Sequence, residues 1–255
     1  MNKNTIYEEN CLETMSKMPD NLLNLTVTSP PYDNLRSYKG YSFDFESVAK
    51  ELYRVTKQGG VVVWVVGDAT IKGSESGTSF KQALFFKECG FNLHDTMIYA
   101  KNNYIPLTHK RYEQQFEYMF VFSKGKPSTF NPIMIECKTK GNKRNRSKSN
   151  KEEGSSVRNR DEVTVTKNFK QKPNIWFENV SNTRLKHPAI FPEKLAEDHI
   201  LSWSNEGDLV YDCFGGSGTT AKMSIKNKRN WLVSEISSEY CEIIRERVNN
   251  AQPQE

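Results

Sequence analysis

Long apolar segments are absent from this 255-residue sequence, and residues 1–5 lack the apolar stretch of a secretory signal. No run approaches the length that a membrane-spanning helix needs, so the sequence argues against a membrane protein and predicts a cytoplasmic one. Cysteine is sparse: the five cysteines are an odd number, and none has CxxC spacing. A disulfide framework and a zinc site are not supported, and we expect no bound metal. A GK[ST] tripeptide is also missing, which argues against an ATPase or GTPase phosphate loop.

Charge is distributed unevenly along the chain, whose formal net charge is +5. Residues 138–172 hold twelve basic and four acidic side chains, a local net charge of +8, which leaves −3 for the rest. A basic block in an otherwise near-neutral protein indicates a polyanionic partner. A solvated, flexible loop without a partner would have the same composition, so charge alone does not choose between these interpretations.

Strand and helix patterns alternate along most of the chain. Strand patterns cover residues 21–29, 61–66, 93–100, 117–123, 208–212 and 231–234. Helical spacing covers residues 43–57, 78–89, 188–203, 219–226 and 238–248. We expect residues 58–60 (Gln-Gly-Gly) to end the first helix and Gly90 to cap the second, whereas residues 124–172 lack regular patterns. Such alternation predicts an α/β fold with a mostly parallel, doubly wound sheet, in which ligands bind at the carboxyl ends of strands where the strand order switches.

A glycine-rich loop, DCFGGSGTT at residues 212–220, lies between a strand pattern and a helix pattern. Glycine lets the backbone turn tightly and approach a ligand, and the N-terminus of the next helix offers N–H groups to an anion. A carboxylate, such as the methionine end of S-adenosylmethionine (SAM), suits this loop as well as a phosphate does. The following strand pattern ends at Glu235, whose carboxylate can accept both hydroxyls of a ribose. A tight structural turn and a surface glutamate are the alternative on these features alone.

The first strand pattern ends in Ser29-Pro30-Pro31-Tyr32. The prolines fix the backbone and leave the Pro30 carbonyl without a strand partner, and the Ser29 hydroxyl adds a second acceptor. Two acceptors on the hydrogens of a ring amine would localise its lone pair, so that the nitrogen can attack a sulfonium methyl group. Tyr32 would stack an extruded base. Considered alone, the motif is more simply a proline-rich turn with a core tyrosine, so the catalytic interpretation requires the two loops to face each other across one site.

Together these segments resemble a known family. Ser29-Pro30-Pro31-Tyr32 resembles the catalytic motif of DNA amino-methyltransferases, and residues 212–220 resemble their cofactor loop, commonly written DPFxGSGTT. Residues 186–195 resemble the segment before that loop, and residues 231–240 resemble the ribose-binding strand and helix. The catalytic motif comes first and the basic segment lies between the two motifs, an order that resembles the beta class. The resemblance implies a Rossmann-like methyltransferase fold with a seven-stranded, circularly permuted, mostly parallel sheet and an antiparallel strand near one edge.

The resemblance also implies domains and site residues. Residues 1–123 would form the catalytic half, residues 124–178 a target-recognition insertion, and residues 179–255 the cofactor-binding half. The catalytic residues carried over by position are Ser29, Pro30, Pro31 and Tyr32. The cofactor SAM would be bound by Asn10, Asp212, Phe214, Gly215, Gly216, Ser217, Gly218, Thr219 and Glu235. DNA would be bound by Arg36, Lys143, Arg144, Arg146, Arg158 and Arg160. Two positions depart from the family: Cys213 replaces a proline, and Asn10 replaces an aspartate that contacts the adenine amine of SAM.

The target base and the partners follow from the same resemblance. Cytosine-N4 enzymes of the family usually carry Ser at the position of Ser29, and adenine-N6 enzymes carry Asp or Asn, so Ser29 favours cytosine N4 over adenine N6. Methylation of cytosine C5 needs a nucleophilic cysteine, conventionally after a proline, and no Pro-Cys dipeptide occurs. The implied partner is double-stranded DNA in a restriction–modification or phage or host-defence setting, with a cognate restriction endonuclease and a homodimer as expectations by analogy. The alternatives are a non-catalytic DNA-binding module and a methyltransferase acting on RNA or on a protein glutamine.

Overall fold

The computed structural model describes residues 1–31, 44–104, 110–144, 164–180 and 191–251. They form two compact units, one of residues 1–131 with 174–255 and the other of residues 132–173. We call the first the main unit and the second the inserted unit. Within the described ranges, no helix is both long enough and apolar enough to cross a membrane.

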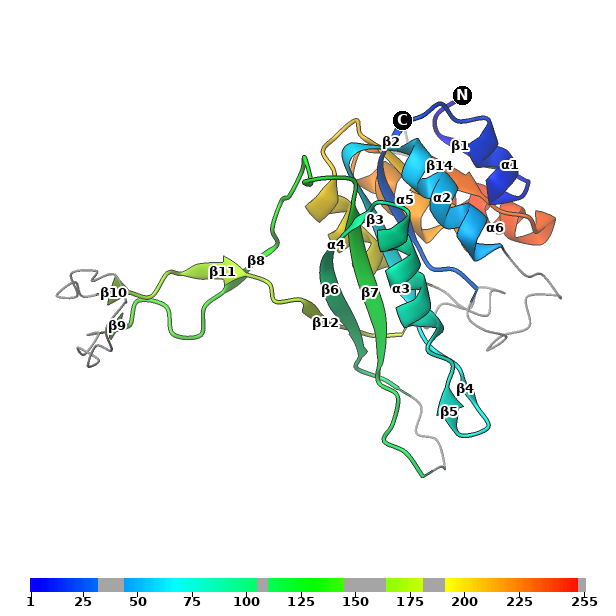
Figure 1. The fold of residues 1–255 in the computed structure, drawn as a ribbon. Helices are drawn as coiled ribbons and strands as arrows, with labels where there is room; N and C mark the ends of the chain where they lie inside the picture. The colour runs from blue at the N-terminus through cyan, green and yellow to red at the C-terminus, as the bar shows by residue number, and fades with distance from the viewer. Residues whose placement is uncertain (32–43, 105–109, 145–163, 181–190, 252–255) are drawn as a thin grey trace. The chain divides into compact units, whose positions relative to one another are not determined.

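The main unit is built on one mixed sheet with the strand order β1-β14-β13-β2-β3-β7-β6-β12 (Figure 1). The strands are β1 (Thr5–Tyr7), β2 (Leu23–Thr28), β3 (Thr56–Val66), β6 (Asn92–Lys101), β7 (Phe116–Ser123), β12 (Ile175–Glu178), β13 (Leu209–Asp212) and β14 (Asn230–Ser234). β7 runs antiparallel to both of its neighbours, and the other pairs in this sheet are parallel. The expected mostly parallel sheet with an antiparallel strand near one edge is therefore confirmed. It has eight described strands rather than seven because β12 adds a short edge strand.

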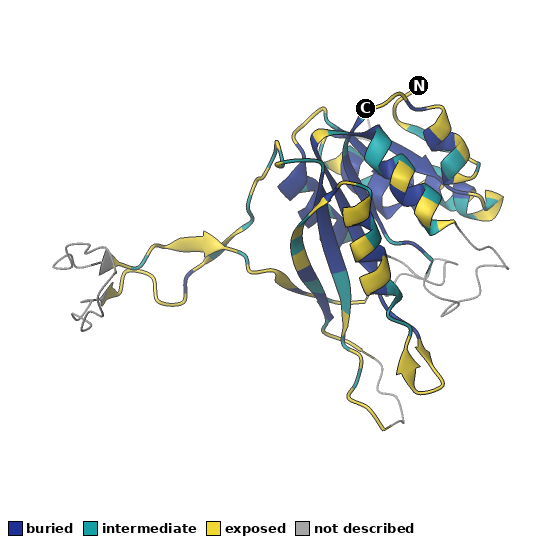
Figure 2. Ribbon diagram, viewed as in Figure 1, coloured by how far each residue is buried: buried dark blue, intermediate teal, exposed yellow. Residues whose placement is uncertain are grey.

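Helices cover both faces of this sheet. Those in the described ranges are α1 (Cys11–Ser16), α2 (Phe45–Val55), α3 (Thr78–Glu88), α4 (Glu193–Trp203), α5 (Thr219–Lys226) and α6 (Ser238–Asn249). On β3, the alternate residues Val62, Trp64 and Val66 pack with α1, α2 and α3. On β14, Trp231 and Val233 pack with α5 and α6. Successive side chains of a strand point to opposite faces, so both faces are buried and the strands carry most of the core (Figure 2).

The strand order reverses between β2 and β13. β2 leads through α2 to β3 on one side, and β13 leads through α5 to β14 on the other. β2 and β13 are themselves parallel neighbours, with Leu25 opposite Val210 and Thr26 opposite Tyr211. Ligands of open parallel sheets bind outside the carboxyl ends of the strands at such a reversal. The loops that leave these two ends begin at residues 29 and 212.

The expected end of the first helix is wrong. The helix ends at Val55, and residues 58–60 do not stop it because they already belong to β3. Thr56 is extended, at φ −72° and ψ 133°, and its Oγ1 donates to the Leu52 carbonyl at 2.6 Å. Gly59, at φ 79°, has another role: a Cβ added there would lie 2.9 Å from the Cβ of Ser128, so glycine permits this close approach.

The helix expected from residue 188 begins later, at Glu193. Pro192 precedes it in an extended conformation, at φ −60° and ψ 129°, and is the N-cap residue. Residues 188–190 of the expected helix lie outside the described ranges.

The inserted unit consists of two short antiparallel pairs. β8 (Met134–Glu136) pairs with β11 (Phe169–Gln171), and β9 (Lys143–Arg144) pairs with β10 (Thr164–Val165). Among its described residues, Cys137 is the one buried hydrophobic side chain, so backbone pairing rather than a core holds the unit. Lys172 N donates to the Ile133 carbonyl at 2.7 Å and brings the two ends of the unit together.

Candidate active site

Side-chain hydrogen bonds join the carboxyl ends of β2 and β13. Thr28 Oγ1 donates to Asp212 Oδ1 at 2.6 Å, and both residues are buried. From the first turn of α5, Thr220 Oγ1 donates to the Val27 carbonyl at 3.2 Å. The serine–proline loop and the glycine loop therefore leave the sheet side by side, which is the arrangement that the sequence-based hypothesis requires.

The serine–proline loop is described as far as residue 31. Ser29 and Pro31 are half-buried, and Pro30 is buried. Lys143 and Arg144, two of the expected DNA-binding residues, form β9 of the inserted unit, and Lys143 is exposed. The other expected catalytic and DNA-binding residues lie outside the described ranges, namely Tyr32, Arg36, Arg146, Arg158 and Arg160.

The glycine loop takes a shape that larger residues would prevent. Gly216 and Gly218 have φ angles of 51° and 75°, in the left-handed region that favours glycine. A Cβ added at Gly215 would lie 2.2 Å from Val233 Cγ1, so the loop packs directly on β14. Gly218 is the N-cap of α5 and has no side chain to bond the first N–H groups of that helix. The N–H groups of the first turn of α5, which Gly218 does not cap, therefore offer a suitable site for an anionic group.

Glu235 lies directly after β14 and holds the glycine loop from the other side. Its Oε2 accepts from Gly216 N at 2.8 Å, and its Oε1 accepts from Ser237 N at 2.9 Å. The residue is 9% exposed, and burial raises the pKa of its carboxyl. Each carboxylate oxygen has more than one lone pair, so both can still accept a hydroxyl of a ligand.

Asp212 is the second buried carboxyl of the site. Burial raises its pKa from 3.8 to about 7, although hydrogen bonds from Thr28 and the Phe214 amide act in the opposite direction. The nearby charge of Glu235 raises it further. A cationic ligand would favour the ionised form, because an opposite charge stabilises a carboxylate that burial has destabilised.

Asn10 lies after β1, which pairs with β14 at the edge of the sheet. Its side-chain oxygen accepts from Leu12 N at 2.9 Å and caps α1. This oxygen has a second lone pair, so it can still accept from a cofactor amine while it caps the helix. Phe214 is half-buried, with its ring centroid 6.1 Å from that of Trp64.

One contact of the glycine loop was missed from the sequence. Arg247, in the last turn of α6 and 8% exposed, donates from Nη1 to the Ser217 carbonyl at 2.6 Å and to Ser217 Oγ at 2.8 Å. Its Nη2 donates to Glu193 Oε1, in the first turn of α4, at 2.7 Å. A single arginine near the end of a helix pattern looks like a solvated charge, so no local signal indicated this contact.

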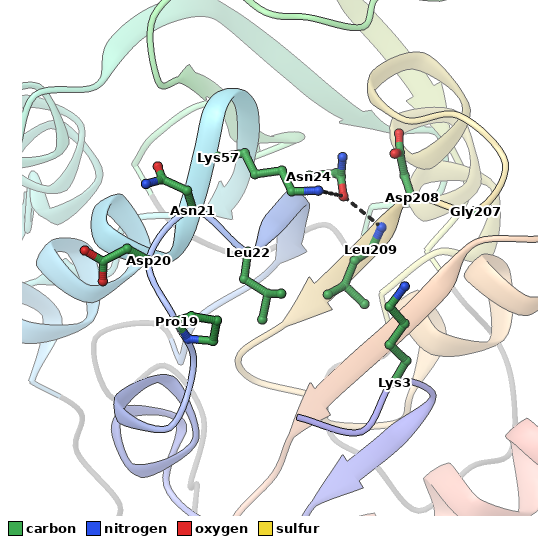
Figure 3. A pocket seen from close by; sticks show the side chains of 10 residues that line it. All are labelled: Lys3, Pro19, Asp20, Asn21, Leu22, Asn24, Lys57, Gly207, Asp208 and Leu209. Atoms are coloured by element: carbon green, nitrogen blue, oxygen red, sulfur yellow. Dashed lines mark hydrogen bonds between the residues drawn. The ribbon is translucent and has the colours of Figure 1, made fainter.

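A cavity of about 230 Å³ lies at the opposite ends of the strands from the candidate site, beside the amino ends of β2 and β13 (Figure 3). Asn24 Oδ1 accepts from both Lys57 Nζ, at 3.0 Å, and Leu209 N, at 3.1 Å, and joins the two strands there. The cavity is lined by Lys3, Pro19, Asp20, Asn21, Leu22, Asn24, Lys57, Gly207, Asp208 and Leu209. These residues include two lysines and two aspartates, and none belongs to the two loops, so the cavity is separate from the candidate site.

A family model described as "DNA methylase" matches residues 23–246, a range that includes both loops. The chain belongs to this family. Among curated relatives, this DNA methylase is 56% identical over 241 residues to the orphan methyltransferase M.BamHII of Bacillus amyloliquefaciens, and the match covers 91% of this chain and 90% of the relative. With the order of its motifs, the chain is a beta-class DNA amino-methyltransferase, as the resemblance implied.

Solved structures agree with the fold of this methylase. The cytosine-N4-specific PvuII DNA methyltransferase matches with a TM-score of 0.73 and 23% identity, over 97% of this chain and 86% of the other. The M1.HpyAVI–SAM complex matches with a TM-score of 0.62 and 21% identity, over 95% and 98% of the two chains. The Rossmann-like methyltransferase fold is therefore confirmed.

Proposed function

We propose that this DNA methyltransferase moves the methyl group of SAM to N4 of a cytosine flipped out of duplex DNA. The observation that carries the proposal is the buried hydrogen bond between Thr28 and Asp212. It brings Ser29, the first residue of the amine-binding motif, beside the glycine loop. Cofactor and base can then meet within one site.

The charges and donors of the glycine-loop site fit SAM, which carries an ammonium, a sulfonium, a carboxylate and two ribose hydroxyls. The N-terminus of α5 supplies N–H groups for the carboxylate. Glu235 accepts from the ribose, and Asp212 provides a carboxyl for the cationic part of the molecule. Phe214 adds an aromatic surface beside them. SAM supplies an electrophilic methyl carbon on a positively charged sulfur.

The residues at the end of β2 prepare the base amine. The Ser29 hydroxyl and the Pro30 carbonyl accept its two hydrogens, so the nitrogen lone pair is withdrawn from the ring and directed at the methyl carbon. Bound SAM would supply the methyl carbon to this nitrogen and would leave with the electron pair of its C–S bond as a neutral thioether. The methylated amine then releases one proton to water. Tyr32, by resemblance, stacks the flipped base.

Ser29 favours cytosine N4 as the target. Serine at this position is typical of cytosine-N4 enzymes in this family, and the PvuII enzyme of similar fold is cytosine-N4-specific. Adenine N6 is the second candidate, because the hydroxyl and the Pro30 carbonyl would accept hydrogens from either amine.

Mass spectrometry of nucleosides distinguishes these candidates. Plasmid DNA from a methylation-deficient host that expresses the protein would be digested and analysed for N4-methyldeoxycytidine and N6-methyldeoxyadenosine. We expect the first product, and its loss with Ser29→Ala while SAM binding by calorimetry is retained. Finding only the adenine product would reassign the target base. Finding neither, with the protein folded and SAM bound, would remove the catalytic proposal.

We propose further that residues 124–178 recognise the target sequence and that the basic residues there contact phosphates, among them Lys143 and Arg144. Each phosphate contact contributes about 0.9 to the slope of log affinity against log salt. Replacing both residues by alanine should therefore reduce the magnitude of that slope by about 2. An unchanged slope would mean that neither side chain contacts a phosphate. A cognate restriction endonuclease and a homodimer complete the proposal, and sedimentation velocity tests the homodimer.

A further inference from the structure

The tip of the glycine loop is held by residues that the chemistry above does not use. Arg247 Nη1 donates to Ser217 O at 2.6 Å, to Ser217 Oγ at 2.8 Å and to Thr219 Oγ1 at 3.2 Å. Ser217 and Thr219 flank Gly218, which has the positive φ angle of 75°. One guanidinium nitrogen therefore binds both sides of the turn that leads into α5.

The other end of the guanidinium is fixed by an acid. Arg247 Nη2 donates to Glu193 Oε1 at 2.7 Å, and Lys222 Nζ donates to the same oxygen at 2.6 Å. Burial alone would raise the pKa of Glu193, but the hydrogen bonds from Lys222 and Arg247 lower it, so the carboxyl is ionised. These three charged residues come from three helices: Glu193 from α4, Lys222 from α5 and Arg247 from α6. A buried arginine that bonds an acid and a loop carbonyl at once has little freedom to turn.

The chemistry of the guanidinium sets the direction of the Ser217 hydroxyl. A guanidinium has only donors, so Ser217 Oγ must accept from it, and the hydroxyl hydrogen must point elsewhere. Thr219 Oγ1 lies 3.4 Å away and donates its own hydrogen to the Phe191 carbonyl at 3.2 Å, so in this pair the Ser217 hydroxyl donates and Thr219 Oγ1 accepts. A separation of 3.4 Å is long for a hydrogen bond between two hydroxyls, so the carboxylate of a bound ligand can replace Thr219 as the acceptor.

We infer that Arg247 is a positioning residue for the cofactor: it holds the glycine loop in its binding shape and, by donating to Ser217 Oγ, leaves the Ser217 hydrogen available to the carboxylate of SAM. The inference rests on the proposed function only in taking SAM as the ligand. Arg247 is not a catalytic residue, because its guanidinium is bonded to Ser217, Thr219 and Glu193 of the protein. Its loss should weaken SAM binding far more than it slows methyl transfer at saturating SAM.

The test uses Arg247→Lys in the full chain, with Arg245→Lys as the matched control. Lysine keeps the charge but cannot bond Glu193 and Ser217 with two separate nitrogens in a fixed plane. Arg245 lies two residues earlier on α6, is more exposed, and pairs with Glu8 and Glu242 on the surface. SAM affinity would be measured by calorimetry without DNA, and KM for SAM and kcat with DNA.

We expect Arg247→Lys to raise the Kd and the KM for SAM by about tenfold or more, the effect of losing one hydrogen bond to a charged group, with kcat within about twofold. Arg245→Lys should change neither. Ser217→Ala should weaken binding too, and adding Arg247→Lys to it should cost less than Arg247→Lys alone. A folded Arg247→Lys protein with lower thermal stability but wild-type SAM affinity would make the residue merely structural and overturn the inference.

The same data separate this inference from the proposed function. If the wild-type protein binds no SAM, the cofactor assignment fails. If it binds SAM but methylates no DNA, the catalytic proposal fails, and the comparison of Kd values still decides the role of Arg247. If Arg247→Lys does not fold, Arg247→Met is the second variant. It can neither donate to Ser217 nor pair with Glu193, and a wild-type Kd from it would likewise overturn the inference.

Discussion

The carboxyl of Asp212 should make the stability of the protein depend on pH, and Asp212→Asn should remove that dependence. Burial places its pKa at about 7 in the folded protein, against an ordinary value of 3.8. Between these pH values the unfolded chain has released a proton that the folded protein still holds. Stability therefore falls as pH rises through this window, and above it the ionised carboxyl destabilises the fold by its full amount.

The magnitude follows from the two pKa values. Their difference corresponds to about 4 kcal/mol, at 1.36 kcal/mol per pH unit. Asparagine cannot ionise, yet its side-chain oxygen can still accept from Thr28 Oγ1 and the Phe214 amide, as Asp212 Oδ1 does. We therefore expect the Asn variant to be the more stable protein at pH 8, and the difference in unfolding free energy to shrink by about 3 kcal/mol at pH 5.

Urea denaturation at several pH values between 5 and 8 measures this difference, with tryptophan fluorescence as the signal. Exposed Glu246→Gln is the control, because its carboxyl is in solvent before and after unfolding. Parallel stability curves for the wild type and the Asn variant would refute the reasoning, since Asp212 would then ionise alike in both states. If the variant also binds SAM more weakly at pH 8, the same charge that lowers stability serves binding.

Three further predictions follow from the loop and the units. Gly215→Ala should lower the unfolding free energy by about 1–3 kcal/mol or more, measured as a lower urea midpoint, because its Cβ would lie 2.2 Å from Val233 Cγ1. Glu235→Gln should raise the Kd for SAM, measured by calorimetry, at least about tenfold. One of the two backbone N–H groups that now donate to the carboxylate would then face the NH2 group of glutamine, which cannot accept. Replacing residues 133–172 by a short Gly-Ser linker should leave the SAM Kd within about twofold, because the core lies in the main unit. The same replacement should abolish DNA methylation, because it removes the proposed recognition residues. Loss of the cooperative urea transition would show that the main unit does not fold without these residues and would contradict the prediction.

The sequence predicted best those elements whose patterns are both periodic and bounded. α5 runs from Thr219 to Lys226 as expected, because a buried strand and a glycine loop mark its start. β1 and α1 were missed: they have three and six residues, too few to establish a period. β12 was missed for the same reason. The first helix was expected to end at a Gly-Gly pair, but Gly59 is needed for a contact with Ser128. Ser128 lies 69 positions further along the chain, so the residues around Gly59 give no sign of this contact.

The candidate site divides in the same way. Ser29, Asp212 and Glu235 could be chosen from the sequence because each ends a strand pattern and carries a group suited to the chemistry. Arg247 and Glu193 could not, because each has an ordinary place on a helix and their meeting depends on how α4, α5 and α6 pack. Asn10 was chosen from the resemblance as a cofactor contact, and its use as the cap of α1 is a local contact that only the structure reveals.

The two loops of the candidate site meet although the inserted unit lies between them in the sequence. Thr28 and Asp212 are 184 positions apart, yet their hydrogen bond and the pairing of β2 with β13 lie inside the main unit. The contacts that Gly215, Gly216 and Ser217 make with Val233, Glu235 and Arg247 come from the chain after residue 212. No contact among these is made by residues 132–173, so substitutions in that unit leave these contacts in place. If that unit recognises the target, as we propose, the protein could acquire a new target sequence while the contacts of the glycine loop stay unchanged.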